Sequence, residues 1–219
     1  ATLEAHGISG LSHTTSHGHA SVRASFLAAH LDIDLARALF DGYRQFGPQG
    51  IAIAERYDIE HRRVSAASIG INYDPGRWFA MGELGRIKSG GSYLGDTYTG
   101  YASAGFRAGD LTPYVAYAAV DPDSTISDPG IAPETMPAPY RQQVMVANGY
   151  LKFLLSTIAV QSTVTAGLRW DLGPGMALKV QYDRAHPKAG SRGALVNVRD
   201  DFRSGEPVHV ASAVLDFVF

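Results

Sequence analysis

The 219-residue sequence contains no cysteine, which excludes disulfides, thiol nucleophiles and zinc or iron–sulfur sites built on cysteine. It also lacks any run of about 18 apolar residues, the length that a membrane-spanning helix needs. The longest apolar stretch, residues 150–160, is interrupted by Lys152. A helical membrane protein is therefore excluded. A membrane β-barrel is not, because barrel strands are short and only every second residue in them is apolar.

An excess of charge of one sign is also missing. The sequence has 19 Lys and Arg against 21 Asp and Glu, a net charge of -2, whereas a nucleic-acid-binding protein normally has a clustered basic face. Catalytic motifs are scarce too: there is no nucleophile elbow, no HExxH and no Gly-rich phosphate loop. Ser21, Ser25 and His30 do not make a convincing catalytic set. We therefore expect neither an enzyme nor a cofactor.

What the sequence does contain is apolar and polar residues alternating with a period of two, which is typical of half-buried strands. In residues 163–172, for example, Val164 and Leu168 alternate with Thr165 and Arg169. For residues 77–87 the face is unclear, because Phe79, Met81 and Glu83 fall together. Eight strands are predicted, at about 19–31, 64–74, 77–87, 97–107, 111–120, 161–172, 176–185 and 208–219, with a weaker ninth at 7–14 before a turn at 15–18.

The connections between these strands alternate in length. Turns are short near 74–77, 108–110 and 173–175, and links are long near 33–63, 88–96, 119–160 and 186–207. Short turns at one end and long loops at the other are typical of an outer-membrane barrel. Aromatic residues at strand ends fit an interfacial girdle; they are Tyr73, Trp78, Phe106, Trp170 and Phe219.

The expected fold class is thus all-β, a transmembrane antiparallel β-barrel with short helices in its long loops. A soluble lipocalin-like barrel is the alternative, with its polar and apolar faces exchanged. That alternative would place Arg107, Arg169, Lys179 and Asp183 in a small dry interior, which is unusual for charged residues. Eight strands could close alone. Nine could not close with both ends on the same side, and would indicate that earlier strands of a wider barrel are missing.

Several segments resemble the carboxy-terminal half of a proteobacterial outer-membrane porin, similar to the phosphate-selective and dicarboxylate-type groups. They are residues 64–70, 73–83, 111–117, 161–171, 177–184 and 215–219. The resemblance implies a homotrimeric pore of about 16 or 18 strands in the outer membrane of a Gram-negative bacterium. Residues 1–219 would form one β-barrel domain lacking amino-terminal strands. The alternating residues Leu215, Phe217 and Phe219 match the terminal assembly signal of outer-membrane proteins.

A pore selects by geometry and electrostatics, so its working residues should be charges that face the lumen. The candidates are the cations Arg23, Arg107, Arg169 and Lys179 and the anions Asp74, Asp171 and Asp183. Alternatively, these residues only solvate the lumen and pair across strands, which contributes about 0.2–1 kcal/mol each. The expected function is passive diffusion of small hydrophilic solutes or anions. A non-conducting barrel with a plugged lumen, acting as a structural or assembly partner, is the alternative.

The long loops contain two predicted helices, at 35–46, which ends at Gly47-Pro48, and at 141–156. Either could constrict the mouth of a pore or pack on neighbouring loops. Two groups of residues are candidate metal ligands: Asp121, Asp123 and Asp128, and His13, His17 and His19. The aspartates lack the spacing of a known calcium loop and the histidines fall at a polar turn, so no metal site is expected.

Overall fold

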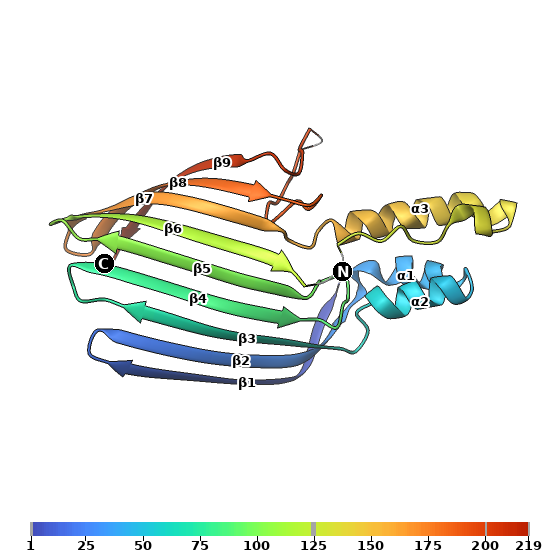
Figure 1. Cartoon of the computed structure of the whole chain (residues 1–219), viewed down its shortest axis with the longest axis horizontal. Coiled ribbons are helices and arrows are strands. Elements are labelled where there is room, and N and C mark those ends of the chain that lie inside the picture. The colour runs from blue at the N-terminus through green and yellow to red at the C-terminus, as the bar shows by residue number, and fades with distance from the viewer. Residues whose placement is uncertain (1, 124–125, 200, 219) are drawn as a thin grey trace.

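The computed structural model describes residues 2–123, 126–199 and 201–218. Nine strands form one antiparallel sheet in which each strand pairs with its neighbours in chain order (Figure 1). Their bounds are β1 Leu3–His17, β2 Ala20–Ile33, β3 Arg62–Tyr73, β4 Trp78–Lys88, β5 Thr97–Phe106, β6 Leu111–Pro122, β7 Gln161–Gly173, β8 Met176–Pro187 and β9 Val208–Phe217. The eight predicted strands are confirmed, and the weaker ninth is a strand of 15 residues.

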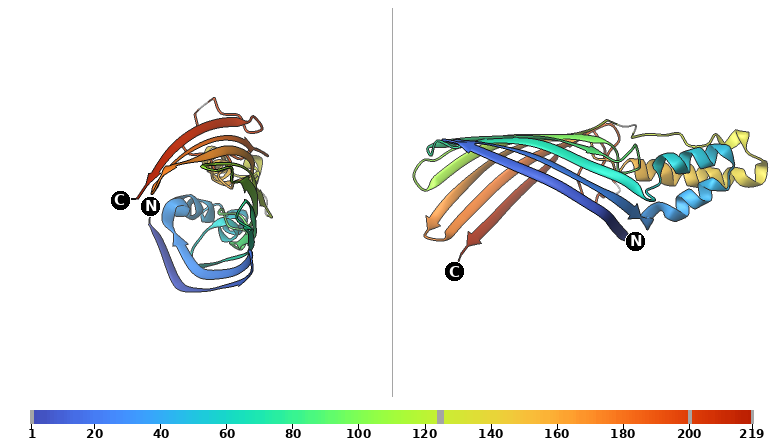
Figure 2. Two further views of the ribbon diagram at one scale, coloured as in Figure 1. Left: turned by 90° about the vertical axis from the view of Figure 1, so that its left-hand side faces the viewer. Right: turned by 90° about the horizontal axis from the view of Figure 1, so that it is seen from below.

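The sheet curls through an arc and stays open. Seen along its length, the arc ends at β1 on one side and at β9 on the other (Figure 2). Within the described residues β1 pairs only with β2, and β9 pairs only with β8. The alternative in which eight strands close by themselves is therefore not what this chain adopts, and the nine strands form a gutter.

The tight turns lie at one end of the gutter and the long connections at the other, as predicted (Figure 1). The turn from β3 to β4 shows why the sequence turns there. Gly76 has a φ of 98°, which a residue with a Cβ rarely adopts, and its N–H donates to Oδ1 of Asp74 at 3.0 Å. Gly175, in the turn from β7 to β8, also has a positive φ, of 74°.

Helices fill the two longest connections and project beyond the end of the sheet (Figure 1). The first connection holds the 3-10 helix η1 Asp34–Ala36, α1 Arg37–Arg44 and α2 Pro48–Tyr57, and the second holds η2 Pro133–Thr135 and α3 Ala138–Leu155. The predicted helix at 35–46 is thus shorter than expected. Helix α2 was not predicted, because Gly47-Pro48 was interpreted only as a helix end, whereas proline is also favoured at the first position of a helix.

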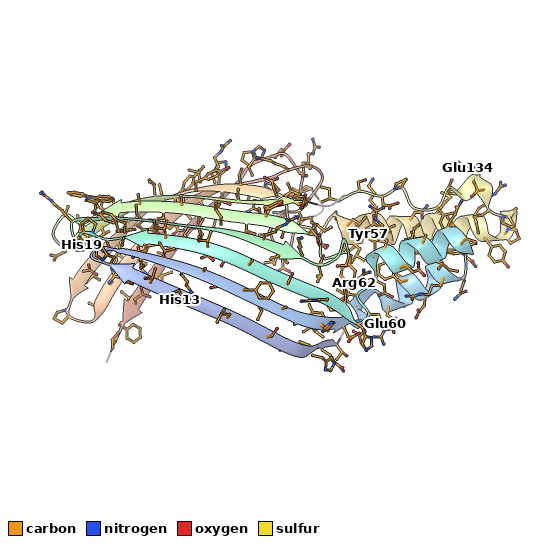
Figure 3. The ribbon with its side chains drawn as sticks, turned by 60° about the horizontal axis from the view of Figure 1, so that its bottom comes forward. His13, His19, Tyr57, Glu60, Arg62 and Glu134 are labelled. Carbon is orange, nitrogen blue, oxygen red and sulfur yellow. The ribbon has the colours of Figure 1, made fainter. Side chains whose placement is uncertain are left out.

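The hydrophobic core lies among these helices rather than in the sheet. Phe40 and Tyr43 of α1 and Leu151 of α3 are fully buried in it. Arg62, the first residue of β3, ties the helices to the sheet, because its Nη2 donates to the carbonyl oxygens of Glu55 and Asp58 at 2.7 and 2.9 Å (Figure 3). No helix among the described residues has the length and apolar character needed to cross a bilayer.

Candidate functional site: the concave face of the sheet

The two faces of the sheet differ in exposure as well as in polarity. In β3, Ile69 and Ile71 are each 57% exposed, whereas the intervening Ser68 and Gly70 are half-buried. The exposed apolar row continues across the neighbouring strands because of the pairing register. It runs through Ile71, Gly82, Ala102, Tyr117 and Val164, each opposite the next. All of these residues except the half-buried Gly82 are exposed, so the apolar residues form an exposed band across the strands.

The half-buried polar face is the concave one, since curling a sheet crowds the side chains on its inner side. A contact that skips a strand supports this: the hydroxyl of Tyr114 in β6 donates to Oε1 of Gln181 in β8 at 2.7 Å, above β7. Polar side chains thus point into the gutter and apolar ones point outward. This is the arrangement expected from the sequence for a barrel, and it is opposite to that of a soluble one.

The crossing by Tyr114 depends on a glycine. A Cβ on Gly167 of β7 would lie 2.2 Å from Cζ of Tyr114, so only glycine leaves room for the ring. Gln181 in turn donates from Nε2 to Asp183 Oδ2 at 2.8 Å, and Thr165 Oγ1 donates to Asp183 Oδ1 at 2.5 Å. Asp183 was predicted from the sequence, but its two neutral partners and the reach of Tyr114 were not, although a glycine beside an aromatic residue on the next strand is a recognisable signal.

Two of the predicted cations, Arg169 and Lys179, lie on the concave face and are paired with acids. Arg169 Nη2 lies 2.6 Å from Oδ1 of Asp171, two residues along the same strand. Lys179 Nζ lies 2.9 Å from Oδ2 of Asp216 in β9, a partner that the sequence analysis did not identify. All four side chains are half-exposed, so each pair neutralises its own charge locally and contributes little to stability.

Arg23 differs from these cations because it has no acidic partner among the described residues. Its Nε donates to Oγ of Ser12 at 3.0 Å. Glu83 lies on the same row of the sheet: Gly70 of β3 is opposite both Arg23 in β2 and Glu83 in β4. The register therefore resolves the ambiguous strand, placing Glu83 together with Phe79 on the concave face. Arg23, which has no acidic partner among the described residues, and the carboxylate of Glu83 therefore lie on either side of Gly70 on the concave face.

Asp74 and Arg107 lie elsewhere than the other candidates, just beyond the ends of β3 and β5 at the short turns. Arg107 donates to the two carboxylate oxygens of Asp74 at 2.8 and 2.7 Å and to the carbonyl oxygen of Gly76 at 2.7 Å. Hydrogen bonding to Arg107 lowers the pKa of Asp74 to about 2. The pair therefore braces two neighbouring turns at the edge of the gutter rather than lining its middle.

The residues weighed as metal ligands are dispersed. Asp123 pairs with Arg86, and Asp128 accepts a hydrogen bond from the hydroxyl of Tyr57 at 2.8 Å. His13 and His19 lie apart, on β1 and at its turn (Figure 3). Across the part of the chain that the structure describes, no three His, Asp or Glu side chains are grouped as a metal would need.

Four of the five predicted aromatic residues, Tyr73, Trp78, Phe106 and Trp170, lie at the turn end of the sheet. Tyr73 and Trp78 are exposed and face each other across their turn, with ring centroids 5.2 Å apart. In β9, Leu215 and Phe217 are exposed and follow the outward apolar rows, opposite Leu178 and Met176. Phe219, the last residue of the predicted assembly signal, lies outside the described residues.

No protein-family model matches the sequence, and no curated protein matches it. Among solved structures, the chain is similar to one described as "Outer-membrane expressed OmpT of Vibrio cholerae", with a TM-score of 0.45 and 8% sequence identity. The match covers 95% of this chain and 54% of that one, so this chain spans about half the length of the structure it matches.

Proposed function

We propose that this chain forms part of the wall of a porin in the outer membrane of a Gram-negative bacterium. In this proposal the concave face lines a water-filled channel, and small hydrophilic solutes, including anions, diffuse through it passively. The observation that supports the proposal most directly is the pairing of an exposed apolar band on the convex face with a polar concave face. Lipid on one side and water on the other stabilise that arrangement.

The length of the strands supports the same proposal. Strand β3 has 12 residues, which at about 3.3 Å per residue gives about 40 Å. Tilted by about 40°, as barrel strands are, it would span about 30 Å along the membrane normal, enough for the ~25 Å apolar band of an outer-membrane barrel.

The open edges require further strands. The outer edges of β1 and β9 carry backbone N–H and C=O groups that cannot face lipid, because an unpaired polar backbone group in hydrocarbon costs several kcal/mol. We propose that strands beyond these nine complete a ring of about 16–18 strands. Trimers of that ring, in line with the resemblance to porins, complete the proposed assembly.

One observation favours the alternative of a plugged, non-conducting barrel. Seen along the gutter, α1 and α2 fall within the arc of the sheet (Figure 2). The helices therefore lie in line with the space that solutes would cross. They lie beyond the sheet rather than inside it (Figure 1), so they narrow the mouth in this proposal and leave the wall of the channel free.

Conductance in planar lipid bilayers tests the proposal. The folded ring, formed with the strands that complete it, should give discrete ion-sized steps, and Arg23→Glu should shift the reversal potential in a salt gradient toward cations. Arg169→Glu should do the same, because it leaves Asp171 unpaired. Arg199→Glu is the matched control, since Arg199 lies in an exposed loop. A complete, folded ring that gives no steps would overturn the pore and favour the plugged barrel.

A further inference from the structure

A cavity of about 760 Å³ lies where the helices meet the sheet, and its volume is that of a small-molecule site. Its walls are formed by η1 and α1, by the end of α3 and the residues after it, by concave-face residues of β4, β5 and β6, and by the loops between β4 and β5 and between β8 and β9. Its lining is mainly apolar, including Leu39, Val120, Phe153 and Ile158. None of the charged residues discussed above belongs to it.

The one charged side chain that lines this cavity is Arg192, from the loop between β8 and β9. Its guanidinium stacks on Phe153, with Cζ 5.0 Å from the ring centroid. No acid among the described residues pairs with it, and its Nε–H is buried without an acceptor. The guanidinium therefore carries a positive charge that no acid among the described residues neutralises, at the wall of an apolar cavity.

The loop holds Arg192 in place before any ligand arrives. Its backbone N–H donates to the carbonyl oxygen of Ser156 at 3.2 Å. The preceding Ser191 is fully buried, donates from Oγ to the carbonyl oxygen of Ile158 at 2.5 Å and accepts from the N–H of Val160 at 3.2 Å. The cation is therefore pre-positioned, which reduces the entropy lost when a ligand binds.

Tyr93 adds a second unpaired donor to the lining. It is 4% exposed, it stacks on Phe40, and its hydroxyl has no hydrogen-bond partner among the described residues. Burial raises the pKa of Tyr93 to about 12, so the hydroxyl remains protonated and able to donate at neutral pH.

From this geometry we infer that the cavity binds a small organic anion with an apolar body. The body occupies the apolar walls, and the anionic group accepts hydrogen bonds from the Nη groups of Arg192. Such a site is distinct from the polar wall of the gutter. The inference does not depend on conduction, because binding is measured at equilibrium on the folded chain in detergent.

The test measures binding of three probes by equilibrium dialysis, with empty micelles as the blank. We expect saturable binding of 3-phenylpropionate, and much weaker binding of acetate, which lacks the body, and of 3-phenylpropanol, which lacks the charge. Arg192→Gln should weaken binding of 3-phenylpropionate about 10–100-fold. The affinity of Arg192→Lys for 3-phenylpropionate should lie between those of the unmodified chain and of Arg192→Gln, because lysine keeps the charge and loses the planar guanidinium geometry.

Arg199→Gln is the matched control, because Arg199 belongs to the same loop and its side chain is 87% exposed. It should bind 3-phenylpropionate like the unmodified chain. Far-ultraviolet circular dichroism checks that each variant keeps its sheet. Absence of saturable binding, equal binding by Arg192→Gln and Arg199→Gln, or equal affinity for acetate and 3-phenylpropionate would overturn the inference. Conductance steps without binding of 3-phenylpropionate would overturn only this inference. Binding without conductance steps would overturn only the proposed pore.

Discussion

Two neighbouring residues of β3 allow a sharp test of which face of the sheet meets lipid. Ile69 is on the convex face and Ser68 on the concave face, so Ile69→Arg and Ser68→Arg place the same side chain on opposite sides of one strand. If the convex face contacts hydrocarbon, the first variant buries a charge in lipid, whereas the second adds a charge to a polar surface.

The depth of Ile69 sets the expected size of the effect. It precedes Tyr73 by four residues, about 13 Å along the strand at ~3.3 Å per residue, or about 10 Å along the membrane normal after tilting. That places it near the midplane of a ~25 Å apolar band, where an outward arginine costs about 2–4 kcal/mol. Ser68→Arg should cost less than about 1 kcal/mol, as is usual for a surface substitution.

Urea-induced unfolding in lipid vesicles, followed by tryptophan fluorescence, measures both free energies of unfolding. The midpoint for Ile69→Arg should fall well below that for Ser68→Arg. An exposed isoleucine in a water-soluble protein can be replaced by arginine within about 0.5 kcal/mol. Equal midpoints for the two variants, or a lower one for Ser68→Arg, would therefore refute the assignment of the convex face to lipid.

Two further predictions concern hydrogen bonds, one at the short turns and one on the concave face. In Arg107→Gln the pKa of Asp74 should rise from about 2 toward 3.8, which NMR titration of its carboxyl group measures. The pKa of Asp74 is lowered in the folded state of the unmodified protein. The ion pair therefore adds to the free energy of unfolding above about pH 4, and this addition is lost as the pH falls through 2. An unchanged titration would contradict the pairing. Tyr114→Phe should lower the free energy of unfolding by about 0.5–1.5 kcal/mol, whereas Gly167→Val should cost more, because it displaces the Tyr114 ring as well; an equal or smaller loss for Gly167→Val would contradict the crossing.

The strands could be predicted from sequence because alternation is a local property. A period of two shows which residues share a face, and this holds whatever lies next to the strand. Which face is the inner one is not local, because it depends on the sense in which the whole sheet curls. Strand β4 shows the limit: Phe79 and Glu83 fall on one face, but only pairing with β3 shows that this face is concave.

The candidate site was predicted in part for the same reason. Arg23, Arg169 and Lys179 were identified because a charge at an alternating position is visible in the sequence. Their partners were not, since Lys179 pairs with Asp216 through the neighbouring strand, and Tyr114 reaches Gln181 by crossing a third strand. Such contacts follow from strand order and from the space left by a glycine, neither of which a single segment reveals.

The distribution of buried apolar residues assigns the two parts of the chain to different surroundings. The helices bury large side chains such as Phe40 and Leu151 against one another, as a protein in water does. The side chains that the sheet buries most fully include alanines, such as Ala177 and Ala185, while large apolar residues such as Ile69 and Ile71 are exposed on the convex face. In water such a sheet would gain little from the hydrophobic effect and would expose a broad apolar surface. In the proposed membrane location, hydrocarbon against the convex face removes that cost, while the helices remain in water.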